Sequence, residues 1–143
     1  MKSNLIYNEE LLAGKAALVT GGASGLGRSN AVGLSQVGAN VIIVSRQEEV
    51  LAKAAKDISD ETDREVTYDV VDIRDIESVA QLSQRHENID ILVNNAGGQF
   101  PQKARDFTPN GWRSVIDLNL TGTWNMTQAF GNKMLEGVGG SIC

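Results

Sequence analysis

Cysteine, basic residues and long apolar runs are the scarce features of this sequence. With Cys143 as its one cysteine, the chain can form no intrachain disulfide, and nothing in it indicates an oxidising compartment. No apolar run approaches the roughly 20 residues that a membrane-spanning helix requires, and residues 1–15 lack the apolar stretch of a signal peptide. We therefore expect a cytoplasmic protein that contacts no membrane.

The charge balance is acidic. Lys and Arg number 13 against 18 Asp and Glu, which gives a net charge of −5, whereas a nucleic-acid-binding domain would show a basic stripe. We therefore expect no nucleic-acid partner. An anionic ligand would have to be held by local groups, because the overall field repels it.

Length and patterning predict one α/β domain over residues 1–143. At 143 residues, 41% of them hydrophobic and 22% charged, the chain is long enough to bury a core. Strands are expected at 16–20, 41–44, 66–71 and 89–93, and helices at 25–37, at 48–60, from 76, and at 108–136. This alternation predicts a doubly wound parallel sheet with helices on both faces. The chain stops two or three residues into an apparent fifth strand at Ser141-Ile142, so we expect an incomplete domain, truncated at the start of that strand.

A glycine-rich turn follows the first predicted strand directly. Residues 20–27 read Thr-Gly-Gly-Ala-Ser-Gly-Leu-Gly and lead into a helical pattern. Glycine permits positive φ and has no Cβ, so backbone N–H groups can approach an anion closely, and the positive end of the helix dipole favours a diphosphate. The alternative is an ordinary tight turn. As a nucleotide site, the turn would bind through Gly21, Ala23, Ser24, Gly25, Leu26 and Gly27.

The end of the second predicted strand bears on the choice of nucleotide. An acidic residue there normally accepts hydrogen bonds from the ribose of NAD, but this sequence has Ser45 followed by Arg46. A guanidinium offers forked donors to a 2′-phosphate, and each charge-assisted hydrogen bond contributes about 1.5–3 kcal/mol. We therefore expect NADP (NADPH) as the cofactor, with NAD less favoured. The alternative is that Arg46 is a solvated charge at a strand end.

Three motifs in this order resemble the short-chain dehydrogenase/reductase family, and the likeness runs from about Gly14 to Ile142. They are the glycine pattern of residues 20–27, the segment 94–97 (Asn-Asn-Ala-Gly) after the fourth predicted strand, and the segment 117–122 (Asp-Leu-Asn-Leu-Thr-Gly). The resemblance implies a Rossmann-type fold and an NADP-dependent oxidoreductase. The cofactor of such an enzyme carries the hydride, while the protein binds and orients.

The same resemblance implies roles for two side chains beyond the glycine turn. Asp72 would accept a hydrogen bond from the adenine amino group, beside the backbone of Ile73; the alternative is an N-cap, for which Asp75 is the better candidate. Asn119 would be the catalytic asparagine, which distorts its helix and binds a water. The alternative for Asn119 is a residue that kinks the helix without chemistry.

The segment after the fourth predicted strand narrows the resemblance. The backbone of Asn95, Ala96 and Gly97 would pass beside the cofactor's ribose, unless the asparagines are simple turn formers. The extension through Gln99 and Phe100 is similar to peroxisomal trans-2-enoyl-CoA and 2,4-dienoyl-CoA reductases and to citronellol dehydrogenases. This similarity implies a small-molecule substrate, an acyl-CoA or a carbonyl or alcohol compound, that faces Gln99 and Phe100.

The general acid of that family is a tyrosine with a lysine four residues later. The tyrosines here are Tyr7 and Tyr68, and neither has that lysine. The sequence therefore leaves open a second interpretation, a truncated, non-catalytic nucleotide-binding or assembly module, and a third, a chain that does not fold stably. Relatives commonly assemble through their long helices, so the segment 108–136 is a candidate surface for a homo-oligomer.

Overall fold

The computed structural model describes residues 7–143. Residues 1–6 lie outside it, so the expectation of no signal peptide falls partly on residues that the structure does not describe. Five parallel strands form one sheet in the order β3-β2-β1-β4-β5. The strands are β1 (Ala16–Thr20), β2 (Asn40–Ser45), β3 (Val66–Val70), β4 (Ile91–Val93) and β5 (Ser141–Ile142).

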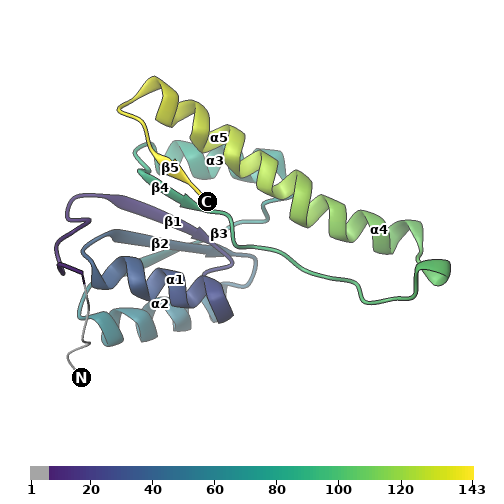
Figure 1. The fold of residues 1–143 in the computed structure, drawn as a ribbon, viewed down its shortest axis with the longest axis horizontal. Coiled ribbons are helices and arrows are strands. Elements are labelled where there is room, and N and C mark those ends of the chain that lie inside the picture. Colours follow the sequence, from purple (N-terminus) through teal and green to yellow (C-terminus); the bar gives the residue numbers. More distant parts are fainter. Residues whose placement is uncertain (1–6) are drawn as a thin grey trace.

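Helices cover both faces of this sheet (Figure 1). The helices are α1 (Gly25–Gln36), α2 (Glu48–Thr62), α3 (Ile76–Arg85), α4 (Pro109–Ile116) and α5 (Thr123–Glu136), with a short 3₁₀ turn at Ala104–Asp106. On one face α1 packs beside α2, and on the other α3 packs beside α5. The predicted doubly wound parallel sheet is therefore confirmed.

Alternation along the central strands divides the core in two. Val19 and Ile43 point toward α1 and α2, whereas Leu18 and Leu92 point toward α3 and α5. All four side chains are fully buried. A strand with both faces buried reads as a continuous apolar run, which is why β1 and β2 were visible in the sequence.

Side chains cap two of the helices, and the cap predicted at Asp75 is confirmed. The side chain of Asp75 caps α3 by accepting from the backbone N–H of Glu77 at 3.1 Å. Thr108 caps α4 by accepting from the N–H of Gly111 at 3.0 Å, and Pro109 occupies the first turn. Each cap satisfies an N–H group that has no partner within its helix.

The fourth strand is shorter than predicted, and Asp90 lies directly before it. The strand was expected from residue 89 but begins at Ile91. The Asp90 carboxylate accepts the backbone N–H of Ala16 at 2.9 Å and the ammonium of Lys15 at 2.8 Å. The backbone of Asp90 still bonds to both neighbouring strands, since its N–H donates to the carbonyl oxygen of Ala16 at 2.9 Å and its carbonyl oxygen accepts from the N–H of Ser141 at 2.8 Å.

The edge strand β3 is joined to the end of α3 by a cluster of charged side chains. Asp69 accepts two hydrogen bonds from the guanidinium of Arg85, both at 3.0 Å, and lies 3.0 Å from Nε2 of His86. Burial raises the pKa of Asp69, but these partners outweigh it, and the net pKa lies below the ordinary value of 3.8.

The long helical segment is continuous but changes its winding midway. A π-helical stretch, Asp117–Gly122, joins α4 to α5, and α4 projects beyond the sheet (Figure 1). Trp112 and Trp124 on this segment are 61% and 59% exposed. Across residues 7–143, no helix combines the length and apolar character needed to cross a bilayer.

Candidate functional site

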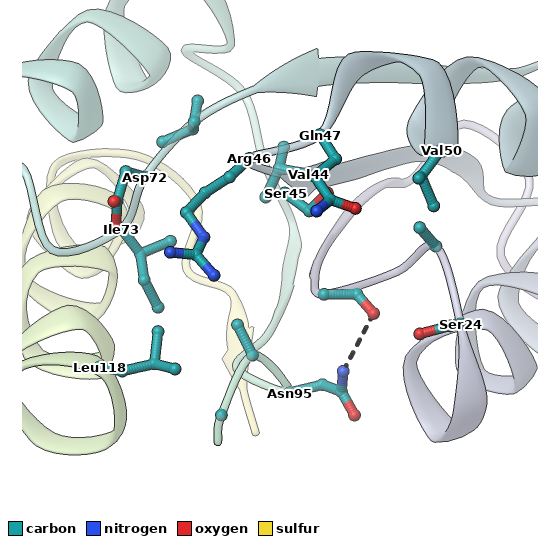
Figure 2. A pocket seen from close by; sticks show the side chains of 15 residues that line it. Ser24, Val44, Ser45, Arg46, Gln47, Val50, Asp72, Ile73, Asn95 and Leu118 are labelled. Atoms are coloured by element: carbon teal, nitrogen blue, oxygen red, sulfur yellow. Dashed lines mark hydrogen bonds between the residues drawn. The ribbon is translucent and has the colours of Figure 1, made fainter. Parts of the chain in front are cut away.

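A cleft of about 370 Å³ opens at the carboxyl ends of the parallel strands. It lies where the strand order reverses, since β1 pairs with β2 on one side and with β4 on the other. Open α/β sheets bind ligands at such a switch point. The cleft is lined by Gly21, Ala23, Ser24, Val44, Ser45, Arg46, Gln47, Val50, Val71, Asp72, Ile73, Asn95, Ala96, Gly97 and Leu118 (Figure 2).

Most of the residues predicted from the sequence lie in this lining. The six that do not are Gly25, Leu26, Gly27 and Asn119, together with Gln99 and Phe100, which were expected to face the substrate. The first three form the opening turn of α1 at the cleft's edge, with Leu26 79% exposed. The lining residues that sequence reasoning missed are Val44, Gln47, Val50, Val71 and Leu118. Val44, Gln47 and Val71 lie at or just after strand ends, which was the available signal, but apolar residues there also fit a core. Val50 lies in α2 and Leu118 in a later helical stretch, and neither position carried a signal.

The turn between β1 and α1 needs its glycines for two different reasons. Gly21 and Gly25 have φ of +65° and +53°, the left-handed region that other residues rarely adopt. Gly27 has ordinary helical backbone, but a Cβ there would lie 2.3 Å from the carbonyl oxygen of Gly21. At Gly25 an added Cβ would meet nothing within 4 Å, so the space before the helix is open.

The amino end of α1 offers free donors to that space. Ser24 is the N-cap and its side chain makes no capping hydrogen bond. The first N–H groups of a helix have no partner inside it, and they carry the positive end of the helix dipole. This end of α1 therefore suits an anion such as a diphosphate.

Thr20 and Asn95 fasten the glycine turn to the end of β4. The Thr20 hydroxyl accepts from the backbone N–H groups of Asn95 at 3.0 Å and Ala96 at 2.9 Å. The Asn95 side chain donates from Nδ2 to the carbonyl oxygens of Thr20 at 3.0 Å and Gly21 at 3.3 Å. These hydrogen bonds tie the ends of the neighbouring strands β1 and β4 together. Thr20, which is 1% exposed, takes part in them and was not among the predicted site residues.

The segment after β3 is held by a side chain from α5. Nδ2 of buried Asn125 donates to the carbonyl oxygen of Ile73 at 3.0 Å. A Cβ on Gly122 would lie 2.6 Å from the Ile73 side chain, so a glycine is required where α5 begins to pass this segment. These contacts fix the wall of the cleft that carries Asp72 and Ile73, and neither Gly122 nor Asn125 was predicted.

Asp72 faces the cleft but is already paired. Arg74 donates from Nε to Oδ1 at 2.9 Å and to Oδ2 at 3.1 Å, and from Nη2 to Oδ2 at 2.5 Å. The hydrogen bonds from Arg74 lower the pKa of Asp72, against a smaller opposing effect of burial, and the charge of Arg46 lowers it further. Asp72 is therefore ionised and acts only as an acceptor.

Arg46 extends into the cleft from the end of β2, toward Ile73 (Figure 2). Ser45 beside it belongs to the strand and is half-buried. Among residues 7–143, no carboxylate forms an ion pair with Arg46 and no side chain or backbone group is hydrogen-bonded to its guanidinium. Its donors are therefore available to a ligand.

Asn119 lies beside the cleft and connects the π-helical stretch to the loop after β4. Its Nδ2 donates to the carbonyl oxygens of Gly98 and Val115, both at 2.8 Å, and its Oδ1 accepts from the Gly98 N–H at 3.1 Å. A Cβ on Gly97 would lie 2.7 Å from Oδ1. The helix is distorted where Asn119 was expected to distort it; its catalytic role stays a prediction.

The residues present fit a nicotinamide adenine dinucleotide. The open amino end of α1 suits the diphosphate, and the unpaired guanidinium of Arg46 suits a further phosphate. Apolar side chains of Val50, Val71 and Ile73 offer walls for a base. No tyrosine lines the cleft, and within the described part of the chain no three His, Cys, Asp or Glu side chains are grouped for a metal ion.

Known proteins resemble this chain in sequence and in structure. The family model for short chain dehydrogenases matches residues 15–143. The peroxisomal 2,4-dienoyl-CoA reductase of Danio rerio is 32% identical over 141 residues, which cover 96% of this chain and 47% of that protein. The citronellol catabolism dehydrogenase AtuB of Pseudomonas aeruginosa superposes with a TM-score of 0.88 at 34% identity, covering 96% of this chain and 57% of that one.

A third similar structure was solved with its cofactor. It is a protein of Shigella flexneri 2a assigned as a short chain dehydrogenase and complexed with NADP, with a TM-score of 0.86 at 31% identity. The match covers 94% of this chain and 59% of that one. The present chain thus spans about half the length of the proteins that it matches.

Proposed function

Because this chain belongs to the short-chain dehydrogenase family, we propose that it binds NADPH in the cleft and serves hydride transfer between nicotinamide and a small-molecule substrate. The substrate class is an enoyl-CoA or a carbonyl or alcohol compound. The observation that carries the proposal is the pairing of two anion sites in one cleft, the amino end of α1 and the free guanidinium of Arg46. The NADP complex of a similar protein supports the choice of cofactor.

Each wall of the cleft has its own part in this proposal. When bound, NADPH supplies the hydride. The first N–H groups of α1 bind the diphosphate, and Arg46 with the Ser45 hydroxyl binds the 2′-phosphate. Asp72 accepts from the adenine amino group in place of one of the two bonds that the single Nε of Arg74 makes to its oxygens, beside the backbone of Ile73.

The loop after β4 positions the reacting end. The backbone of residues 95–97 lies beside the ribose, held in place by Thr20. Asn119 holds the next residue of the loop and retains one acceptor site on Oδ1 for a water. Phe100 is 44% exposed, which supports the proposal that it and Gln99 face the substrate. Neither tyrosine of the sequence precedes a lysine by four residues, so we assign proton transfer to none of these residues.

The test is a pair of titrations on the purified chain, with NADPH and with NADH. We expect NADPH to bind at least about tenfold more tightly, because one lost charge-assisted hydrogen bond corresponds to at least a tenfold change. Arg46→Ala should abolish the difference, while Arg105→Ala, which removes an exposed arginine outside the cleft lining, should keep it. Equal binding of both cofactors to the unmodified chain would overturn the NADPH assignment.

A second candidate is a nucleotide-binding or assembly module without turnover. It rests on the same cleft, whose nucleotide-facing groups are the amino end of α1 and Arg46. Assays with crotonyl-CoA and with simple aldehydes separate the two candidates: NADPH binding with no oxidation in either assay supports the module, and turnover supports the oxidoreductase.

The proposal includes self-association through the helical segment of α4 and α5. Trp112, Leu120 and Trp124 are each about 60% exposed on it, and aromatic residues are enriched in protein interfaces. Sedimentation velocity of the unmodified chain and of Trp124→Glu tests this, with an oligomer expected only for the former. A monomer in both cases would contradict it.

A further inference from the structure

We propose that Arg74 is a positioning residue that sets the preference for NADPH over NADH, by holding Asp72 away from Arg46. This inference rests on the proposed function, since it assumes that Arg46 binds the 2′-phosphate. It concerns Arg74 itself, a residue that does not line the cleft.

The backbone places Arg46 and Asp72 at the same edge of the sheet. Arg46 follows β2 and Asp72 lies two residues beyond β3, and these two strands are parallel neighbours with Ser45 paired to Val70. One further bond, from the N–H of Val71 to the carbonyl oxygen of Ser45 at 2.8 Å, extends the pairing to the strand ends. Both side chains therefore enter one cleft from adjacent positions (Figure 2).

A carboxylate and a guanidinium so placed would ordinarily pair with each other. They do not pair here, because the Asp72 carboxylate is directed to Arg74. Oδ1 accepts the backbone N–H of Arg74 at 3.1 Å as well as its Nε, and Oδ2 accepts Nη2. A carboxylate has about four acceptor sites, and Arg74 uses most of them.

A side chain of α5, Asn125, fixes the segment that carries Asp72 and Arg74. Asn125 donates to the carbonyl oxygen of Ile73 at 3.0 Å and to that of Arg74 at 3.5 Å. The backbone of Arg74 thus has a defined position, and its side chain folds back over two residues to Asp72. Pairing two side chains that are only two residues apart costs little conformational entropy. This favours the pairing of Asp72 with Arg74 over a pairing with Arg46, which follows the neighbouring strand.

Two consequences for the ligand follow from the held carboxylate. The guanidinium of Arg46 keeps its donors for the 2′-phosphate, and the negative charge of Asp72 close to that phosphate is compensated by Arg74. The coupling between Arg46 and Asp72 is already present in the structure, since the charge of Arg46 lowers the pKa of Asp72. Without Arg74, Asp72 would compete with the phosphate for Arg46.

The expected size of the effect is that of an exposed ion pair. Such pairs correspond to about a two- to fivefold change in an equilibrium constant. We therefore expect Arg74→Ala to reduce the ratio of NADPH affinity to NADH affinity by about that factor. NADPH and NADH share the adenine, so a changed adenine contact at Asp72 cancels in the ratio.

A double-mutant cycle separates this mechanism from the loss of a distant positive charge. The four proteins are the full 143-residue chain, Arg74→Ala, Asp72→Asn and the double variant, each titrated with NADPH and NADH by calorimetry. If Arg74 acts by holding Asp72, Asp72→Asn leaves the affinity ratio within about twofold in the presence of Arg74 but restores it in the Arg74→Ala background. Charges that act independently would give the same effect of Asp72→Asn in both backgrounds.

Arg85→Ala is the matched control, because Arg85 donates from Nε and Nη2 to the carboxylate of Asp69 in the same forked geometry, outside the cleft. It should leave the affinity ratio unchanged, while a melting curve of each variant reports any general destabilisation. Additive effects in the cycle, or an unchanged ratio for Arg74→Ala, would overturn the role of Arg74. An unmodified chain that binds both cofactors equally would instead overturn the proposed function, and the role of Arg74 with it.

Discussion

Replacing Gly27 by alanine should destabilise the protein, whereas the same replacement at Gly33 should stabilise it. Both glycines lie in α1 with negative φ. At Gly33 a Cβ meets nothing within 4 Å, but at Gly27 it would lie 2.3 Å from the carbonyl oxygen of Gly21 and 2.4 Å from Nδ2 of Asn95. Comparing Gly27→Ala with Gly33→Ala therefore separates the cost of a close contact from the gain in helix propensity.

The magnitudes follow from those two surroundings. Alanine in place of glycine within a helix contributes about 0.5–1 kcal/mol, and Gly33→Ala should show that full gain. At Gly27 the obstructing oxygen belongs to the backbone and cannot rotate away, so the overpacking should cost about 1–3 kcal/mol net. For a chain of this length 1 kcal/mol changes the melting temperature by about 3 °C. We expect a rise of about 2–3 °C for Gly33→Ala and a fall of about 3–10 °C for Gly27→Ala.

The assay is differential scanning calorimetry of the three proteins at one pH and salt concentration. NADPH titration of each protein gives a second measure, because a displaced Gly21 carbonyl moves the turn that faces the diphosphate. A melting temperature for Gly27→Ala equal to or above that of the unmodified chain would refute the close approach of α1 to the turn.

Three further predictions concern the contacts around the cleft and the edge strand. Thr20→Val removes the acceptor of two part-buried N–H groups, including that of Asn95, and should lower the urea midpoint by an amount equivalent to about 1–3 kcal/mol with an unchanged m-value; an unchanged midpoint would contradict it. Asp69→Asn should cost about 0.5–1 kcal/mol at pH 7. Because the folded-state pKa of Asp69 is lowered, its contribution is present above the unfolded pKa and lost as the pH falls through the folded one, so melting curves of the two proteins should converge in acid. Asn119→Ala should speed hydrogen exchange of the Gly98 amide by about two- to tenfold, and exchange at the original rate would show that Asn119 does not hold the loop.

The sequence was sufficient for those parts of the fold whose causes are local. The buried strands β1 and β2 have continuous apolar runs, and the caps at Asp75 and Thr108 sit directly before their helices. The start of β4 was placed two residues too early, and the side-chain contacts of Asp90 before it, with residues more than 70 positions away, could not be foreseen. The family resemblance, including the likeness to 2,4-dienoyl-CoA reductases and citronellol dehydrogenases, is confirmed.

The same distinction between local causes and distant contacts applies to the candidate site. Its glycines and Arg46 were found because motif and strand position single them out. Thr20 and Asn125 were missed because their importance lies in partners far along the chain. Asp72 and Arg74 are only two positions apart, but no repeating pattern in the sequence indicates that they pair. The structure shows that the carboxylate is turned to Arg74.

The tie between Thr20 and Asn95 also sets when the cleft can form during synthesis. The two residues are 75 positions apart, and a ribosome adds about 5–20 residues per second. The glycine turn therefore leaves the ribosome about 4–15 s before the segment that holds it. During that interval β1, α1 and β2 can assemble from near neighbours, but their central strand still lacks its second partner. A nascent chain that stalls between the two residues would present the open side of β1 to other polypeptides, so holding chaperones should bind such intermediates most strongly before β4 emerges.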